Sequence, residues 1–257
     1  MDLTKELQKA KEAAFQAGAC ILEVYKEDFK TEYKEDNTPV TKADHLANQL
    51  IVNRLSLAFP EDAILSEEAK DDKSRMLKQR CWIIDPLDGT KEFVKKNGEF
   101  TVNIALIHKK EPVLGVVYIP VREELYFAVK GKGAYHEKEG IEKKIHVSKR
   151  TENISAACSR SHTSEALIEV LEKRGIKERI YAGSALKGCM IASGKAEIYY
   201  RFGLTSEWDT AALQCIIEEA GGIFRQMDDS KMTYNRTDTV NRKGFYILNR
   251  IENKLQI

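Results

Sequence analysis

The order of two helical patterns and a series of short apolar runs constrains the fold of this chain most strongly. Apolar residues recur at spacings of three and four over residues 3–25 and again over 42–59, which predicts two amphipathic helices. Runs of the length of buried strands follow at 81–84, 100–108, 113–119 and 124–129. Because helical and strand patterns stay interspersed, we expect an α/β or layered α+β fold.

The second half of the chain repeats this mixture of short elements. Its patterns predict helices at 165–173, 186–192 and 209–220, and strands at 154–158, 196–200, 223–225 and 244–248. The polar stretch 26–38 is interpreted as an extended loop. The length suits one domain over 1–257, with the charged stretch Glu137–Arg150 as a seam between two halves, 1–145 and 146–257.

The charge balance excludes several classes of function. The 41 basic and 40 acidic side chains leave a formal net charge of +1, and 42% of the residues are hydrophobic. This composition is too apolar and too weakly charged for a disordered chain. A near-neutral chain has no global field that attracts a nucleic-acid polymer, although a local basic pocket for a small anion remains compatible with it.

The cysteines and the apolar segments bear on the location of the protein. The five cysteines are scattered and form no C-x-x-C pair, so we expect neither a zinc site nor a disulfide framework. No apolar run approaches the length of a membrane span, and residues 1–10 lack the apolar core of a signal peptide. We expect a cytoplasmic protein, with peripheral membrane association and the oligomeric state left open.

The segment Trp82–Thr90 carries the most chemical information. An apolar strand pattern ends abruptly in Asp85 and Asp88, with Pro86 between them and Gly89 and Thr90 after them. Carboxylates at the end of a buried strand are costly unless they are paired. A hard divalent cation prefers such oxygen ligands. The pattern therefore predicts that Asp85, Asp88 and the Leu87 carbonyl bind one or two Mg²⁺ ions.

Two alternatives apply to this segment. Asp, Gly and Pro are common turn residues, so a surface turn is one of them. A second is the Asp-x-Asp-Gly-Thr motif of haloacid-dehalogenase-type phosphatases, in which the first Asp is the nucleophile. Here the carboxylates of Asp85 and Asp88 stand one residue further apart and far from the N-terminus, which disfavours that mechanism.

Other acidic residues are candidates for the same cation site. Glu67 and Glu68 follow a short strand-like run at Ala63–Ile64, although acids in such a position are often solvated. Asp209 stands at the start of an apolar helical pattern, where a structural N-cap is the alternative to a metal ligand.

Together, Asp85–Thr90, the upstream Glu67–Glu68 pair and the downstream Trp208–Asp209 pair resemble the inositol monophosphatase superfamily of Mg²⁺-dependent, lithium-sensitive phosphatases. The resemblance extends over residues 8–248. It implies a sandwich of alternating helix and sheet layers, αβαβα, and a phosphomonoesterase that binds two or three Mg²⁺ ions.

Five further segments narrow the resemblance to the 3'(2'),5'-bisphosphate nucleotidases of the CysQ type. They are Asp88–Phe93, Asn97–Asn103, Ser159–His162, Gly183–Lys187 and Arg201–Gly203. The resemblance implies hydrolysis of adenosine 3',5'-bisphosphate, or its sulfated analogue, to AMP and phosphate in sulfur metabolism. At Arg201 a guanidinium suits a second phosphate through a bidentate contact. An inositol-phosphate or sugar-phosphate phosphatase and a non-enzymatic phosphonucleotide-binding protein are the alternatives.

The resemblance also implies roles for the two halves, with 1–145 as an N-terminal metal-binding half and 146–257 as a C-terminal substrate half, and for individual residues. The implied metal ligands are Glu67, Asp85, the Leu87 carbonyl, Asp88 and Asp209. Asp44 and Thr90 would act together to activate the attacking water. The implied substrate contacts are Gly89, Thr90, His162, Ser184, Lys187, Arg201 and Asp209.

Overall fold

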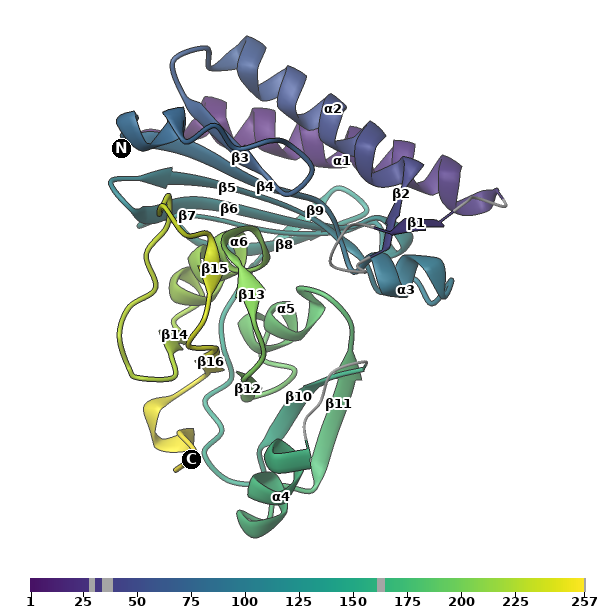
Figure 1. Cartoon of the computed structure of the whole chain (residues 1–257). Helices are drawn as coiled ribbons and strands as arrows, with labels where there is room; N and C mark the ends of the chain where they lie inside the picture. The colour runs from purple at the N-terminus through teal and green to yellow at the C-terminus, as the bar shows by residue number, and fades with distance from the viewer. Residues whose placement is uncertain (28–30, 34–38, 161–164, 257) are drawn as a thin grey trace.

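The computed structural model describes residues 1–27, 31–33, 39–160 and 165–256, and Figure 1 labels its elements. Two long helices, α1 (Thr4–Lys26) and α2 (Lys42–Ala58), cover one face of a seven-stranded sheet. Both helices match the ranges that the sequence predicts. Small buried residues of α1, such as Ala13, Ala14 and Ala17, allow the helix to pack closely. Helix α2 begins at a capping box of Thr41 and Asp44 and ends before Pro60.

The seven-stranded sheet carries the apolar runs of the first half. Its order is β3 (Ala63–Ser66), β4 (Arg80–Asp88), β5 (Thr101–His108), β6 (Glu111–Ile119), β7 (Glu124–Val129), β8 (Gly133–Lys138) and β9 (Ile141–Ile145). Strands β3 and β4 are parallel and all other pairs are antiparallel. Alternate residues of β4 enter different cores: Trp82 and Ile84 face α1 and α2, whereas Cys81 and Ile83 face the opposite side.

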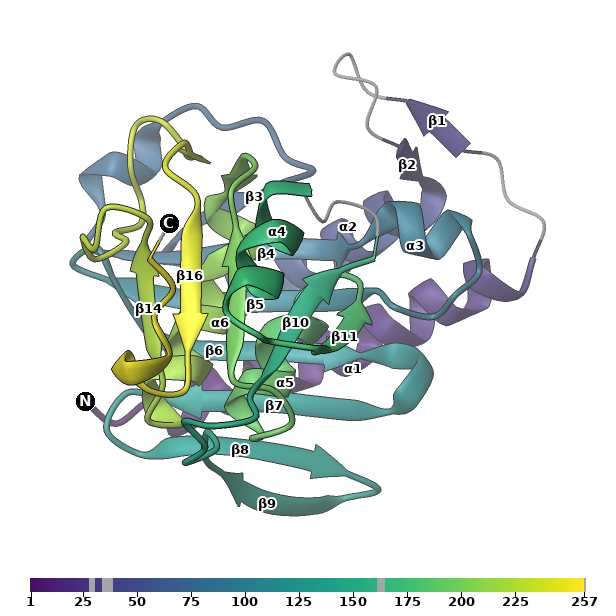
Figure 2. The same ribbon diagram turned by 90° about the horizontal axis from the view of Figure 1, so that it is seen from below.

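A second helix layer separates this sheet from a five-stranded one. Helices α5 (Leu186–Ala192) and α6 (Glu207–Glu219) lie between the two sheets (Figure 1). The second sheet has the order β11 (Glu178–Ala182), β10 (Ser155–Ser159), β12 (Ile198–Arg201), β16 (Phe245–Leu248) and β14 (Ile223–Gln226). Its strands run across those of the first sheet (Figure 2). Helix α4 (Glu165–Lys173) packs on its outer face through Leu167 and Leu171. The expected αβαβα layering is confirmed.

Several short elements differ from the sequence-based expectation. The charged stretch 137–150 was expected to be a seam, but residues 141–145 form the edge strand β9, and the chain leaves the sheet only after Ile145. The edge strand has mostly exposed charged residues and therefore lacks an apolar signal. Strand β1 (Thr31–Tyr33) falls in the predicted loop and pairs with β2 (Pro39–Thr41). The division into halves at residue 145 stays a prediction.

Several further elements were not predicted. They are strands β2, β8 and β11, helix α3 (Thr90–Val94) and the short paired strands β13 (Thr205–Ser206) and β15 (Val240–Asn241). Helix α6 begins at Glu207, two residues before the predicted start. No helix in the described part of the chain is long and apolar enough to cross a membrane.

A close approach between β6 and α6 fixes the height of α6 above the sheet. A Cβ atom added at Gly115 would lie 2.3 Å from the backbone oxygen of Ala212. Because the obstacle is backbone, Gly115→Ala is expected to displace α6 and to lower the free energy of unfolding by about 1–3 kcal/mol. Urea denaturation monitored by circular dichroism measures this change. An unchanged midpoint would show that the sheet and α6 are not held at this separation.

Candidate active site

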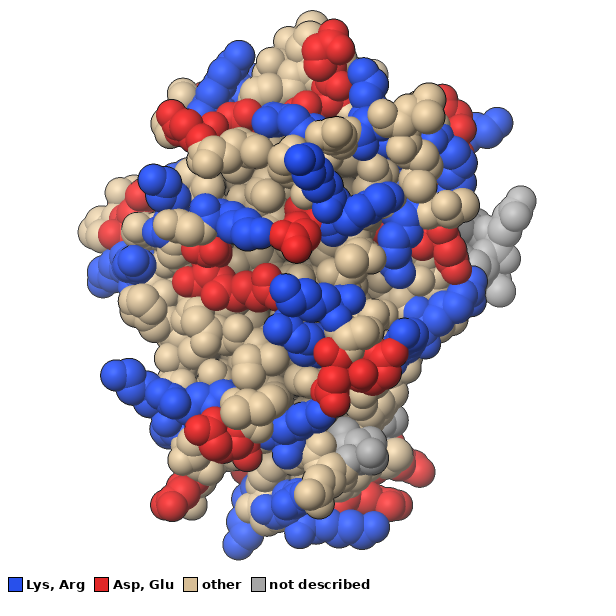
Figure 3. All heavy atoms as spheres, turned by 90° about the vertical axis from the view of Figure 1, so that its left-hand side faces the viewer, with Lys and Arg blue, Asp and Glu red and all other residues tan. Residues whose placement is uncertain are grey.

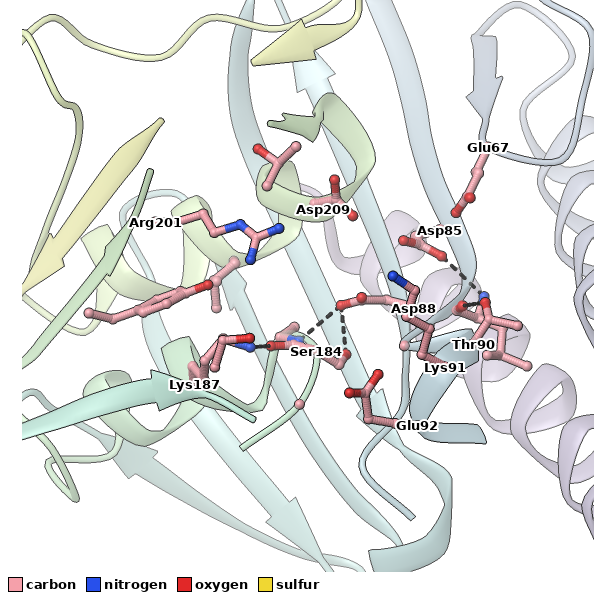
Figure 4. Close-up of a pocket in the computed structure, with 18 of the residues that line it drawn as sticks. Glu67, Asp85, Asp88, Thr90, Lys91, Glu92, Ser184, Lys187, Arg201 and Asp209 are labelled. Atoms are coloured by element: carbon pink, nitrogen blue, oxygen red, sulfur yellow. Dashed lines mark hydrogen bonds between the residues drawn. The ribbon is translucent and has the colours of Figure 1, made fainter. Parts of the chain in front are cut away.

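The ends of elements from both sheets meet around a cavity of about 290 Å³. Figure 4 shows its lining: β4 provides Asp85 and Asp88, α3 follows directly, and α6 provides Asp209. The turn from β11 to α5 and the end of β12 form the opposite wall, with Ser184 and Arg201. The structure thus brings together most of the site residues that the sequence predicts.

Three carboxylates form the centre of the site. Asp85, Asp88 and Asp209 each offer an oxygen, and these oxygens lie within 4.8 Å of one another. Glu67 extends from the segment after β3 toward Asp85 (Figure 4). Asp85 is only 1% exposed and belongs to β4, so the surface-turn alternative is wrong for this segment. Asp209 is not the N-cap of α6; Ser206 is, and Asp209 Oδ2 accepts a 2.5 Å hydrogen bond from the Ser206 backbone N–H.

The electrostatics of these carboxylates fit a cation. Burial raises the pKa of Asp85 well above its usual value, and the negative charges of Glu67, Asp88 and Asp209 raise it further. Burial and the charge of Asp88 raise the pKa of Asp209 to about 8. Four carboxylates this close repel one another when ionised, and a divalent cation would relieve that repulsion. The donor set, all hard oxygen atoms, matches such an ion.

Asp88 is held in one orientation by four donors. Its Oδ2 atom accepts hydrogen bonds from Ser184 Oγ at 2.6 Å, from the Ala185 backbone N–H at 2.9 Å, from Asn103 Nδ2 at 3.2 Å and from Thr101 Oγ1 at 3.4 Å. Thr101 Oγ1 lies 2.7 Å from Ser184 Oγ and extends this network. The predicted substrate contact Ser184 therefore has a second role, since its hydroxyl orients a carboxylate of the cluster.

Asp44 and Thr90 form the predicted pair beside the cluster. Thr90 Oγ1 lies 3.2 Å from Asp44 Oδ1 and 3.2 Å from the Leu87 carbonyl oxygen. Asp44 Oδ2 accepts hydrogen bonds of 2.7 Å from both the backbone N–H and the hydroxyl of Thr41. Burial raises the pKa of Asp44, while the bonds from Thr41 oppose this effect. The pair is thus anchored by the start of α2 and opens onto the cavity at Thr90.

The two predicted cations differ in their surroundings. Arg201 extends from the end of β12 into the cavity, on the side of Asp209 (Figure 4). Lys187 is only 4% exposed, and its ammonium group donates to the backbone oxygens of Ser184 at 2.6 Å and Ala182 at 3.4 Å. Burial lowers the pKa of Lys187 to about 8. The predicted contact His162 lies outside the described residues.

Sequence reasoning gave no role to several residues at this site. Further cavity-lining residues are Lys91, Glu92, Ser159, Tyr199, Leu204, Thr205, Leu213 and Phe245. Thr101 and Asn103 interrupt the apolar run of β5, and this alternation was the available signal. The antiparallel register pairs Asp85 with Asn103 and Asp88 with Thr101, which places both polar side chains beside the cluster.

Comparison with known proteins agrees with this geometry. Residues 2–254 match the model of the inositol monophosphatase family. The 3'(2'),5'-bisphosphate nucleotidase CysQ of Salmonella typhimurium is 42% identical, over 94% of this chain and 98% of that protein. The crystal structure of CysQ from Bacteroides thetaiotaomicron superposes with a TM-score of 0.84 at 40% identity, covering 97% of this chain and all of that one. An inositol monophosphatase from Anabaena gives 0.78 at 26% identity, over 98% and 94%.

Proposed function

The chain belongs to the inositol monophosphatase family and is a hydrolase, and we propose that it removes the 3'-phosphate from adenosine 3',5'-bisphosphate to give AMP and inorganic phosphate. One observation carries the proposal: a carboxylate cluster that could hold a cation, Thr90 of the Asp44–Thr90 pair and Arg201 all line the same cavity. The relatives of 40–42% identity named as 3'(2'),5'-bisphosphate nucleotidases support the choice of substrate.

The family is metal-dependent, and we propose two or three Mg²⁺ ions as the cofactor. The proposed ligands are Glu67, Asp85, the Leu87 carbonyl, Asp88 and Asp209. The burial of Asp85 and the mutual repulsion of the carboxylates support this assignment. When bound, Mg²⁺ supplies positive charge to the phosphate oxygens and lowers the pKa of water.

The protein's own residues then position the reactants. Asp44 is proposed to draw a proton from the attacking water through the Thr90 hydroxyl, since the two side chains already share a hydrogen bond. Gly89 and Thr90 are proposed to contact the phosphate that leaves. Gly89 adopts a φ of 93°, and a Cβ there would lie 3.1 Å from the Glu99 backbone oxygen. The absence of a side chain keeps the chain close to this wall of the cavity.

The second phosphate is proposed to bind at the opposite wall. Arg201 would hold it through a bidentate contact, assisted by Lys187 and Ser184, which line the same cavity. His162 and Asp209 are the remaining proposed substrate contacts. Since inositol 1-phosphate has no second phosphate for Arg201, this cation favours the bisphosphate over an inositol-phosphate or sugar-phosphate substrate. A purely binding protein would gain nothing from the Asp44–Thr90 pair.

A substrate panel with Mg²⁺ titration tests the proposal, and its most informative variant is Arg201→Met. The wild type is expected to hydrolyse adenosine 3',5'-bisphosphate with a kcat/KM at least about 10-fold above that for inositol 1-phosphate. Losing a charged hydrogen-bond pair costs about 1.5–3 kcal/mol, so Arg201→Met should lower kcat/KM for the bisphosphate about 10–100-fold. Turnover of adenosine 3'-monophosphate, which lacks the 5'-phosphate, should stay within about 2-fold of the wild type. Equal or faster hydrolysis of inositol 1-phosphate would overturn the proposal.

The surface and the thiols support a small-molecule enzyme of the cytoplasm. On the face shown in Figure 3, acidic and basic side chains are interspersed and do not segregate into one basic patch. Such a surface suits a small nucleotide bound in a cavity better than a nucleic-acid polymer. All five cysteines are free thiols, and four of them are buried, as expected in a reducing compartment.

A further inference from the structure

An ion pair outside the proposed metal and substrate residues joins the two sheets beside the cavity. We propose that Glu99 and Arg160 are positioning residues, which hold the Gly183–Ala185 turn against Asp88 and thereby set the affinity of the carboxylate cluster for a divalent cation. The inference rests on the proposed cation site but not on the identity of the substrate.

The pair connects three segments that are distant in the sequence. Glu99 is 8% exposed and lies just before β5. Its Oε2 atom accepts hydrogen bonds from Arg160 Nε at 2.7 Å and from the Gly183 backbone N–H at 2.8 Å, and its Oε1 atom accepts one from the same guanidinium at 2.6 Å. Arg160, just after β10, also donates to the backbone oxygens of Tyr181 and Ala182. The Glu99 carboxylate thus links the start of β5 in the first sheet to the residues that follow β10 and β11 in the second sheet.

The turn held by Glu99 is the one that reaches Asp88. Ser184 adopts a φ of 51°, in the left-handed region, which is costly for a residue with a side chain. This conformation presents the Ser184 hydroxyl and the Ala185 backbone N–H to Asp88 Oδ2 at 2.6 and 2.9 Å. Because the turn is strained, its position depends on the bonds that flank it. The bond from the Gly183 N–H to Glu99 is one of these and flanks Ser184 directly in the sequence.

The turn also fits tightly against the backbone before β5. A Cβ at Gly183 would lie 2.7 Å from the Glu99 backbone oxygen and 2.8 Å from Glu92 Cγ. Burial alone would raise the pKa of Glu99, but the hydrogen bond and charge of Arg160 outweigh it and lower the pKa, so Glu99 is ionised at neutral pH. Removing Arg160 would leave this charge without its partner and loosen the contact with Gly183.

A matched ion pair elsewhere in the chain provides the control. Glu197 accepts hydrogen bonds from Arg150 at 2.9 Å and from the Ser155 backbone N–H at 2.7 Å, so it too joins an arginine to a backbone N–H, although Arg150 contacts only its Oε1 atom. The side chains of Arg150 and Arg160 are equally exposed, at 47% each. Neither Arg150 nor Glu197 lines the cavity. Arg160→Ala and Arg150→Ala therefore remove similar ion pairs. Within the described residues, only the pair of Arg160 is connected by hydrogen bonds to the turn that contacts Asp88.

The test titrates Mg²⁺ into metal-free protein by calorimetry, with thermal unfolding measured in parallel. Loss of a residue that orients a metal ligand through another group costs about 10–100-fold in affinity. Arg160→Ala is expected to weaken Mg²⁺ binding about 10-fold, while Arg150→Ala stays within about 2-fold of the wild type at a similar loss of thermal stability. Arg160→Lys, which keeps the charge but loses the bidentate contact, should bind with intermediate affinity.

The outcomes separate this inference from the proposed function. Equal effects of Arg160→Ala and Arg150→Ala on the Mg²⁺ dissociation constant would overturn the positioning role, as would an unchanged constant in Arg160→Ala. If Arg160→Ala does not fold, the comparison of Arg160→Lys with Arg150→Lys decides by the same criterion. If the wild type binds no Mg²⁺ that depends on Asp85, the cation site of the proposed function fails, and the inference fails with it.

Discussion

Asp85→Asn is expected to abolish hydrolysis and, in metal-free buffer, to make the protein more stable. Activity should fall by about 10³-fold or more, because a metal ligand contributes several kcal/mol and each 1.36 kcal/mol is a factor of about ten. The amide oxygen can still accept the 3.2 Å hydrogen bond from the Leu87 backbone N–H, so the local structure is retained. What disappears is a buried charge beside Glu67, Asp88 and Asp209.

The stability gain has a definite dependence on pH. The pKa of Asp85 is higher in the folded than in the unfolded protein, so folding is penalised wherever the carboxyl of the unfolded chain is ionised. The penalty is absent below the unfolded pKa and grows as the pH rises from there to the folded pKa. The melting temperature of Asp85→Asn should therefore exceed that of the wild type more at pH 8 than at pH 5, with about 2–4 °C for each kcal/mol.

Thermal unfolding in EDTA at both pH values measures this difference, and Asp62→Asn is the control. Asp62 is paired with Arg80 at 2.7 Å and accepts a hydrogen bond from Trp82 Nε1 at 3.1 Å, so its neutralisation should lower the melting temperature. Mg²⁺ should then raise the melting temperature of the wild type but not that of Asp85→Asn. A lower melting temperature of Asp85→Asn at both pH values would contradict the account of the cluster.

The carboxylates of the site could be predicted because each lies at a local boundary in the sequence. Asp85 ends an apolar run, and Asp209 stands near the start of an apolar helix. The groups that orient them could not be predicted in this way, because they depend on pairing between distant segments. Thr101 and Asn103 reach Asp88 because of the register between β4 and β5. Ser184 reaches Asp88 from the turn that follows β11 of the second sheet.

The lack of a local signal also explains why some strands could not be predicted from the sequence. Strand β9 lies at the edge of its sheet and β11 at the edge of the other, so neither needs two apolar faces. Lys187 illustrates a further limit, because a lysine in the sequence suggests an exposed cation. The structure buries it and directs its ammonium group to two backbone oxygens of the turn beside Asp88. Burial of this kind follows from the packing of α5 and has no local signal.

The second large effect is expected at the pair of Asp44 and Thr90, where one change should stop catalysis with little effect on folding. In Asp44→Asn, the amide oxygen must face the Thr41 backbone N–H, which now donates to Asp44 Oδ2 at 2.7 Å. The amide NH₂ group must then face Thr90. An NH₂ group can only donate, so the hydrogen bond with the Thr90 hydroxyl is kept in length but reversed in direction.

The amide NH₂ group cannot accept a proton from the Thr90 hydroxyl, so kcat of Asp44→Asn should fall by about 10²–10⁴-fold. The Mg²⁺ dissociation constant should stay close to the wild-type value, since Asp44 is not among the proposed ligands. Thr90→Ser keeps the hydroxyl and should retain most of the activity, whereas Thr90→Val removes it and should resemble Asp44→Asn. Steady-state kinetics at saturating Mg²⁺ and calorimetric titration separate these effects. Near-normal kcat in Asp44→Asn, with bound Mg²⁺, would assign the activation of water to another group.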